Sequence, residues 1–151
     1  MRRADIAVDL YDRGFHCSQA VLAAFAEELG LTKEQALRLG SCLGSGMRKG
    51  EVCGACTGAL MTLGLRYGQD TEGDTASRLC SNRVCDKLMA RCAEVNGSYL
   101  CNDLLGYDVT TQEGLQAIRK RKLFTTLCPQ MVRSAVEIVE QIMKEEHEGD
   151  E

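Results

Sequence analysis

The sequence has no tryptophan, few aromatic residues of any kind, and no excess of positive charge. Aromatic residues make up 5% of the chain, and 22 acidic residues outnumber 18 basic ones, for a formal net charge of -4. Proteins bind nucleic acid through cationic side chains that meet the phosphate backbone and through aromatic rings that stack on bases. Because both are scarce here, we expect no nucleic acid as a partner.

Long apolar runs are also missing. The longest nearly uncharged run, 21–26, is far shorter than the ~20 residues that span a bilayer. Near the N-terminus, Asp5, Asp9 and Asp12 interrupt the apolar residues, so the continuous apolar stretch of a signal peptide is absent. We therefore expect a soluble, cytoplasmic protein with no membrane insertion.

Proline occurs once, at Pro129, and runs of β-branched residues are rare. Several long stretches instead carry apolar residues at helical spacing among good helix formers. A chain of 151 residues with 44% apolar residues can bury one core but is short for two domains. The sequence predicts an all-α, single-domain helix bundle of about six or seven helices over 1–143, followed by an acidic disordered tail over 144–151.

Glycines and capping residues mark where these helices begin and end. Gly14, Gly30 and Gly97 follow periodic segments, and Thr32 has the position of an N-cap, as does Thr110 or Thr111. The glycine-rich segment 40–50 resists regular helix, and we expect it to pack as a loop against the start of the helix that follows. The helices are expected at 2–13, 17–30, 33–39, 54–67, 71–95 and 110–123, with a last one beginning at Cys128, and a short turn of helix is expected at 101–105.

Cysteine is the residue type in excess. A reducing cytosol keeps such thiols free, and an odd number of them in a chain that can build an ordinary core argues against a disulfide scaffold. The nine cysteines are Cys17, Cys42, Cys53, Cys56, Cys80, Cys85, Cys92, Cys101 and Cys128.

Four of the nine cysteines have a position in common, because each begins an expected helix. Cys17, Cys53 and Cys101 follow glycine-containing breaks, and Cys128 precedes Pro129, a residue favoured at the first helical position. Free N–H groups at a helix start favour thiolate over thiol, and thiolate is the reactive and metal-binding form. Their spacing does not match a zinc ribbon or a ferredoxin, since no short ligand pair occurs among the four.

The remaining cysteines are open to other interpretations. Cys56 forms a C-x-x-C with Cys53 on the first turn of a helix, the arrangement of dithiol oxidoreductases, although the βαβ context of a thioredoxin is missing. Cys80, Cys85 and Cys92 are read most simply as small packing residues on one helix. No role is assigned to Cys42 in the glycine-rich segment.

The chain resembles the C_GCAxxG_C_C family, whose name describes its members as redox-active. The resemblance rests on an early cysteine at a helix start, a Cys-Gly-Ala-x-x-Gly motif after a glycine-rich loop, and two later cysteines. These elements fall on Cys17, on Cys53 to Gly58, and on Cys101 and Cys128. The phrases CSQAVLAAFAEELGL and GALMTLGLRYG are also similar to the family. The resemblance implies a redox role and names no substrate.

Three functions follow from these observations. In the first, Cys17, Cys53, Cys101 and Cys128 ligate a metal, as an iron–sulfur cluster or zinc, and the protein transfers electrons. In the second, two of these four cysteines cycle between thiol and disulfide with Cys53 as nucleophile, and the C-x-x-C makes Cys56 a further candidate partner. In the third, the protein is a metal-free structural or adaptor protein. The first two call for an electron-transfer or thiol partner protein, and no sequence motif identifies an enzyme class or an oligomeric state.

Overall fold

The computed structural model describes residues 1–149, and its regular structure is helical, as the sequence predicts. A 3₁₀ turn at Glu27–Leu29 and a π-type turn at Gly46–Gly50 connect helices in the first half of the chain. The part of the chain described contains no strand, only an isolated antiparallel bridge between Val52 and Leu100. Within residues 1–149 nine α-helices follow in order: α1 (Arg3–Asp12), α2 (Cys17–Phe25), α3 (Lys33–Gly40), α4 (Gly54–Tyr67), α5 (Thr75–Asn96), α6 (Cys101–Leu105), α7 (Gln112–Lys120), α8 (Leu123–Thr126) and α9 (Cys128–Gly149).

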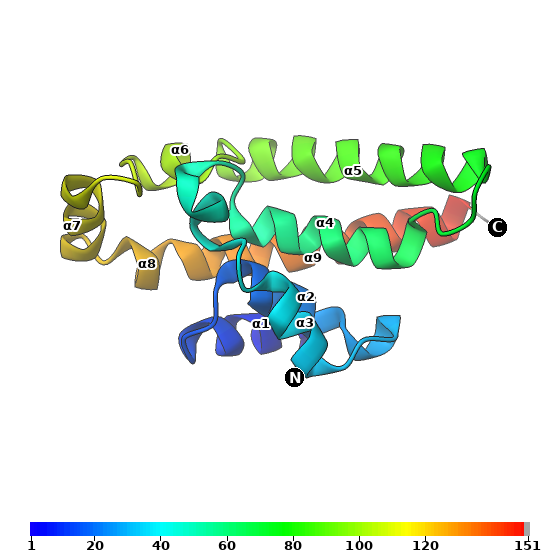
Figure 1. The fold of residues 1–151 in the computed structure, drawn as a ribbon, viewed down its shortest axis with the longest axis horizontal. Coiled ribbons are helices and arrows are strands. Elements are labelled where there is room, and N and C mark those ends of the chain that lie inside the picture. The colour runs from blue at the N-terminus through cyan, green and yellow to red at the C-terminus, as the bar shows by residue number, and fades with distance from the viewer. Residues whose placement is uncertain (150–151) are drawn as a thin grey trace.

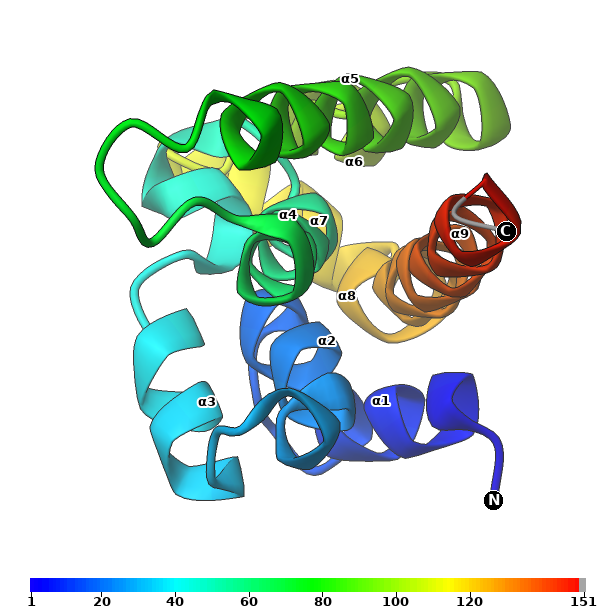
Figure 2. The same ribbon diagram turned by 90° about the vertical axis from the view of Figure 1, so that its right-hand side faces the viewer.

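Three long helices, α4, α5 and α9, form the frame of the molecule (Figure 1). Each of them packs against the other two, while α2 packs on α4 and α1 packs on α9 (Figure 2). The short helices α6, α7 and α8 lie at the end of the frame where α4 and α9 begin (Figure 1). Several helix starts therefore meet at that end.

The main hydrophobic core lies between α1, α2, α4, α5 and α9. Phe25, Leu63, Leu88 and Ile142 are among its largest fully buried side chains. Burying such a side chain contributes roughly 1.5–3 kcal/mol to folding, so this core accounts for the stability of the frame. No helix of the described residues is both long enough and apolar enough to cross a membrane.

The expected caps are confirmed. Thr32 accepts a hydrogen bond from the Gln35 N–H (3.1 Å), and the Gln35 side chain accepts one from the Thr32 N–H (2.9 Å), which completes a capping box at α3. Thr111 accepts a hydrogen bond from the Gly114 N–H (2.9 Å) and caps α7. These bonds satisfy N–H groups that have no partner within the helix.

The glycine-rich segment 40–50 packs against the start of α4, as expected. The carbonyl oxygen of Leu43 lies 3.3 Å from the position that a Cβ atom would take at Gly54. The segment is a tight turn rather than an open loop, because Ser45, Met47 and Arg48 adopt left-handed backbone conformations with φ of 54°, 59° and 64°. Such conformations are unfavourable for residues with a Cβ atom, so surrounding contacts must hold them.

Two expectations about helix limits are corrected. The described chain contains more helices than the six or seven expected, partly because the helix expected at 110–123 ends at Lys120, and Lys122 (φ 57°) separates α7 from the short α8. The acidic segment from 144, expected to be disordered, continues α9 as far as Gly149. Its Glu145 and Glu146 pair with cations of α5, which stabilises helix where the composition alone favours disorder. Residues 150–151 of that segment lie outside the described residues.

Candidate functional site

Each of the four cysteines expected at a helix start has that position. Cys17, Cys101 and Cys128 are the first residues of α2, α6 and α9, and Cys53 is the N-cap residue of α4. Backbone N–H groups at these positions lack intrahelical partners and carry the positive end of the helix dipole. The local environment of each sulfur therefore favours negative charge, against the cost of burial.

The isolated bridge brings Cys53 and Cys101 together. On one side of the Val52–Leu100 pair the Cys53 N–H donates to the Tyr99 carbonyl (2.8 Å), and on the other the Cys101 N–H donates to the Glu51 carbonyl (2.6 Å). Two short segments, far apart in the chain, are thus held in antiparallel register. The starts of α4 and α6 lie next to each other as a result.

Close packing of α2 on α4 brings Cys17 to the same place. A Cβ atom at Gly54 would lie 3.3 Å from the Cβ of Cys17, and one at Gly58 would lie 2.7 Å from the Ser18 carbonyl oxygen. The Ser18 hydroxyl in turn donates to the Gly40 carbonyl (2.7 Å), which joins α2 to the end of α3. Small residues on the first turns of α4 allow this approach.

All four cysteines line one cavity of about 590 Å³. Cys53 and Cys101 are buried, at 6% and 8% exposure, whereas Cys17 and Cys128 are half-buried. Arg48 from the left-handed turn, Arg119 from α7 and Asp12 from α1 place charges on the wall. Apolar side chains complete the lining: Phe15, Leu105, Val109, Leu115 and Phe124.

Cys53 is the thiol most strongly favoured as a thiolate. A hydrogen bond from the Cys56 thiol lowers the pKa of Cys53 to about 7, against the opposing effect of burial. The backbone N–H groups of Ala55 and Cys56, on the first turn of α4, lower this pKa further. A substantial fraction of Cys53 is consequently ionised at neutral pH.

Cys17 and Cys128 form a second thiol pair in the cavity. The Cys17 thiol donates a hydrogen bond to Cys128, which raises the pKa of Cys17 and lowers that of Cys128. The Tyr11 hydroxyl lies within reach of both the Phe124 carbonyl (2.5 Å) and the Cys128 sulfur. Cys101 makes no such bond, and its burial, followed by the nearby Cys53 and Cys128, raises its pKa to about 12.

Cys92 is a residue of the site that sequence reasoning assigned to packing. It is fully buried in α5 and accepts a hydrogen bond from Cys56, which lowers the pKa of Cys92. Cys80 and Cys85 are half-buried on the same helix, which is compatible with the packing interpretation. Cys42 is exposed and lies outside the cavity lining. Helical periodicity places Cys92 on an apolar face but does not say which side chain it meets.

The four family cysteines share one cavity wall. A four-cysteine metal or iron–sulfur site needs sulfurs directed at one centre. Within residues 1–149, no group of three or more His, Cys, Asp or Glu side chains is arranged to hold a metal ion. The metal-ligand role expected for Cys17, Cys53, Cys101 and Cys128 stays a prediction.

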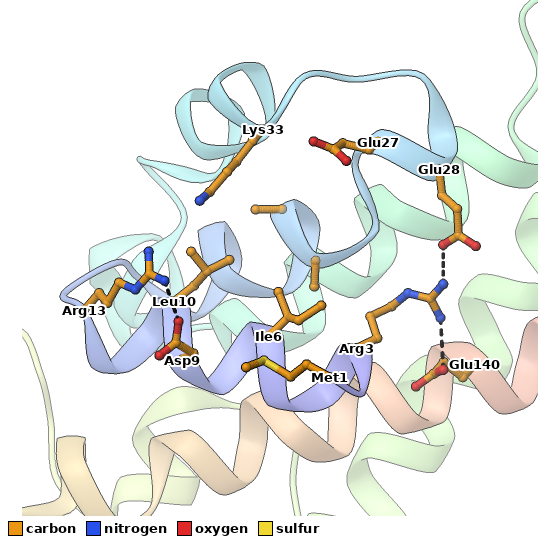
Figure 3. Close-up of a pocket in the computed structure, with 12 residues that line it drawn as sticks. Met1, Arg3, Ile6, Asp9, Leu10, Arg13, Glu27, Glu28, Lys33 and Glu140 are labelled. Carbon is orange, nitrogen blue, oxygen red and sulfur yellow. Dashed lines mark hydrogen bonds and ion pairs between the residues drawn. The ribbon is translucent and has the colours of Figure 1, made fainter.

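Another cavity, of about 510 Å³, lies between α1, α2, the 3₁₀ turn at Glu27–Leu29 and the middle of α9, and no cysteine lines it (Figure 3). Arg3 spans its wall and pairs with Glu28 and with Glu140 (2.9 Å). Arg13 and Asp9 form a further ion pair (2.8 Å). Its charges are largely neutralised in pairs, so the cysteine-lined cavity is the better candidate site.

Comparison with curated proteins and with solved structures gives no significant match. A family model described as "Putative redox-active protein (C_GCAxxG_C_C)" matches residues 15–142. The matched range contains all four cysteines that line the cavity and most of the frame that positions them. The chain therefore belongs to the C_GCAxxG_C_C family, whose name indicates a redox-active protein.

Proposed function

We propose that the protein catalyses or relays thiol–disulfide exchange, with Cys53 as the attacking thiol and Cys56 as the thiol that resolves the intermediate. The observation that carries the proposal is the position of Cys53: it lines the cavity, begins α4, and accepts a hydrogen bond from Cys56. A thiolate attacks a disulfide best when its pKa is near the ambient pH, and that of Cys53 is about 7.

The reaction is an exchange of disulfide bonds. The Cys53 thiolate attacks one sulfur of a disulfide substrate, a mixed disulfide forms, and the other half leaves as a thiolate. The Cys56 thiol then attacks the Cys53 sulfur, forms the Cys53–Cys56 disulfide and releases the second half of the substrate, which takes up the Cys56 proton as it leaves as a thiol. The substrate disulfide is thus reduced by two electrons to two thiols, and the protein dithiol is oxidised by the same two electrons.

The cavity indicates what kind of disulfide fits. Its volume of about 590 Å³ lies within the range of small-molecule sites. Arg48 and Arg119 offer two guanidinium groups to carboxylates, while the apolar wall suits aliphatic parts of a ligand. A low-molecular-weight disulfide with carboxylate groups matches these features, and an exposed disulfide or thiol of a partner protein is the second substrate class.

A four-thiolate metal or iron–sulfur site is the other candidate function. It is favoured by one observation, that Cys17, Cys53, Cys101 and Cys128 all line the same cavity. The pairing of Cys53 with Cys56 supports the exchange reaction instead, and within residues 1–149 no group of three or more possible ligands is arranged to hold a metal ion. Metal content separates the two functions.

Anaerobic purification followed by elemental analysis and a visible spectrum tests the metal, and thiol counting with oxidised glutathione tests the exchange. We expect wild-type protein to lose one pair of thiols that includes Cys56 reversibly, with dithiothreitol restoring them. Cys53→Ser should no longer form this reversible disulfide, whereas the matched control Cys42→Ser, at an exposed cysteine outside the cavity, should still form it. The four-thiolate site would be favoured instead if wild-type protein contains stoichiometric metal and forms no reversible disulfide, and if Cys53→Ser contains no metal.

A further inference from the structure

Buried thiols continue from the cavity into the core between α4 and α5. Cys56 and Cys92 are 3% and 0% exposed. On α5, Val84, Leu88 and Cys92 are spaced by four residues and form the buried stripe of that helix. The helix α5 packs against α4, and Cys56 of α4 and Cys92 of α5 belong to the same buried core cluster. The hydrogen bond between the two side chains places their sulfurs next to each other.

Cys56 is the central member of three thiols in contact. Its S–H hydrogen-bonds to Cys53 on the cavity side and to Cys92 on the core side. A thiol has one proton, so the two bonds are alternatives, and both neighbouring sulfurs lie within reach of the Cys56 sulfur. The order Cys53, Cys56, Cys92 leads from the cavity wall to a fully buried position.

A simple packing role does not explain this contact. A buried cysteine that only fills space behaves as a small apolar residue and is satisfied by apolar neighbours. Cys92 instead lies against the one sulfur that is also the partner of the cavity thiol. Its position is that of a nucleophile next to the disulfide that Cys53 and Cys56 would form.

We propose that Cys92 is a second resolving cysteine, which moves the disulfide from the cavity wall into the core. This inference rests on the proposed exchange reaction at Cys53. After the Cys53–Cys56 disulfide has formed, the Cys92 thiol attacks the Cys56 sulfur. A Cys56–Cys92 bond forms, the Cys53–Cys56 bond breaks, and the proton of Cys92 passes to the departing Cys53 sulfur. The exchange is internal, so it needs no further oxidant and leaves the protein with the same number of disulfides.

The consequence is a protein that stores one disulfide and remains reactive. Cys53 is again a free thiol at the cavity wall while the oxidised pair lies out of reach of solvent, between α4 and α5. A buried disulfide is protected from attack by external thiols, because exchange requires access to a sulfur. A second molecule of substrate can then react at Cys53 before the stored disulfide is reduced.

The test is to treat the full-length protein with oxidised glutathione, quench with acid, alkylate free thiols and map disulfide-linked peptides by mass spectrometry. In wild-type protein we expect the Cys56–Cys92 linkage, with Cys53 alkylated or carrying glutathione. In Cys92→Ala the Cys53–Cys56 linkage should persist instead. The matched control is Cys85→Ala on the same helix, whose half-exposed side chain should leave the wild-type pattern unchanged.

Wild-type protein alone decides the question if Cys92→Ala fails to fold. A Cys53–Cys56 linkage with Cys92 recovered as a free thiol would overturn the role of Cys92 and leave the proposed function intact. The absence of any linkage to Cys53 or Cys56 would overturn both. A Cys56–Cys92 linkage that also forms in Cys53→Ser at the wild-type rate would show that Cys92 acts independently of the cavity, and it would contradict the relay.

Discussion

Replacing Gly58 with alanine is expected to lower the free energy of unfolding, although alanine is the better helix former. A Cβ atom at Gly58 would lie 2.7 Å from the Ser18 carbonyl oxygen and 3.1 Å from the Val21 Cβ. The first contact involves backbone, so α2 must shift, and overpacking of this kind costs ~1–3 kcal/mol. Alanine returns ~1 kcal/mol of helix propensity. We expect a net loss of up to ~2 kcal/mol, or a fall in melting temperature of up to roughly 6 °C.

Gly64 on the same helix provides the matched control. It is exposed, and a Cβ atom there would meet nothing within 4 Å. Gly64→Ala should therefore gain ~0.5–1 kcal/mol from helix propensity alone. Urea unfolding followed by circular dichroism measures both changes. If the two substitutions change stability equally, the close approach of α2 to α4 is wrong, and with it the placement of Cys17 beside the start of α4.

The remaining predictions concern the thiols and the pairing of α5 with α9. Cys53→Ser should abolish exchange with little loss of stability, since serine caps a helix well. Cys85→Ser should leave exchange unchanged and alter the free energy of unfolding by no more than ~0.5 kcal/mol. Thiol titration measures the exchange, and thermal melting measures the stability. Alkylation of Cys53 should rise tenfold per pH unit below its pKa of about 7 and level off above it, as peptide-resolved kinetics would show. Arg91 holds the pKa of Glu145 at about 2, so Glu145→Gln should cost ~0.5–1 kcal/mol at neutral pH and low salt. The contribution of Glu145 to the free energy of unfolding is present above its unfolded pKa of ~4.3 and is lost as the pH falls towards 2. Urea unfolding should therefore show that the stability difference between Glu145→Gln and wild-type protein vanishes near pH 2.

Much of the fold could be predicted from local signals. The cap at Thr32, the stop at Gly97 and the packing of segment 40–50 on α4 each depend on a few neighbouring residues. The continuation of α9 beyond 143 could not be predicted, because it depends on ion pairs such as that of Glu145 with Arg91 across two helices. The composition of that segment shows that it is acidic, but it does not show that cations of α5 lie beside it.

Part of the candidate site could likewise be predicted from local signals, and part of it could not. The four cysteines at helix starts are readable from glycine breaks and from Pro129. A single backbone bridge between Val52 and Leu100 brings Cys53 beside Cys101. No alternation of apolar and polar residues in the sequence predicts this bridge. The contact of Cys92 with Cys56 depends on the register of α5 against α4, which single-sequence periodicity does not determine. The sequence therefore identifies the reactive thiol better than its partners.

The central claim, that Cys53 attacks and Cys56 resolves, is tested most directly by trapping the mixed disulfide in Cys56→Ser. A serine hydroxyl can still donate to the Cys53 thiolate but cannot displace the bound thiol. After brief treatment with oxidised glutathione and an acid quench, the account predicts one glutathione on Cys53 in this variant and a Cys56-containing disulfide in wild-type protein. Glutathione found on Cys42 or Cys101 while Cys53 remains free would contradict it.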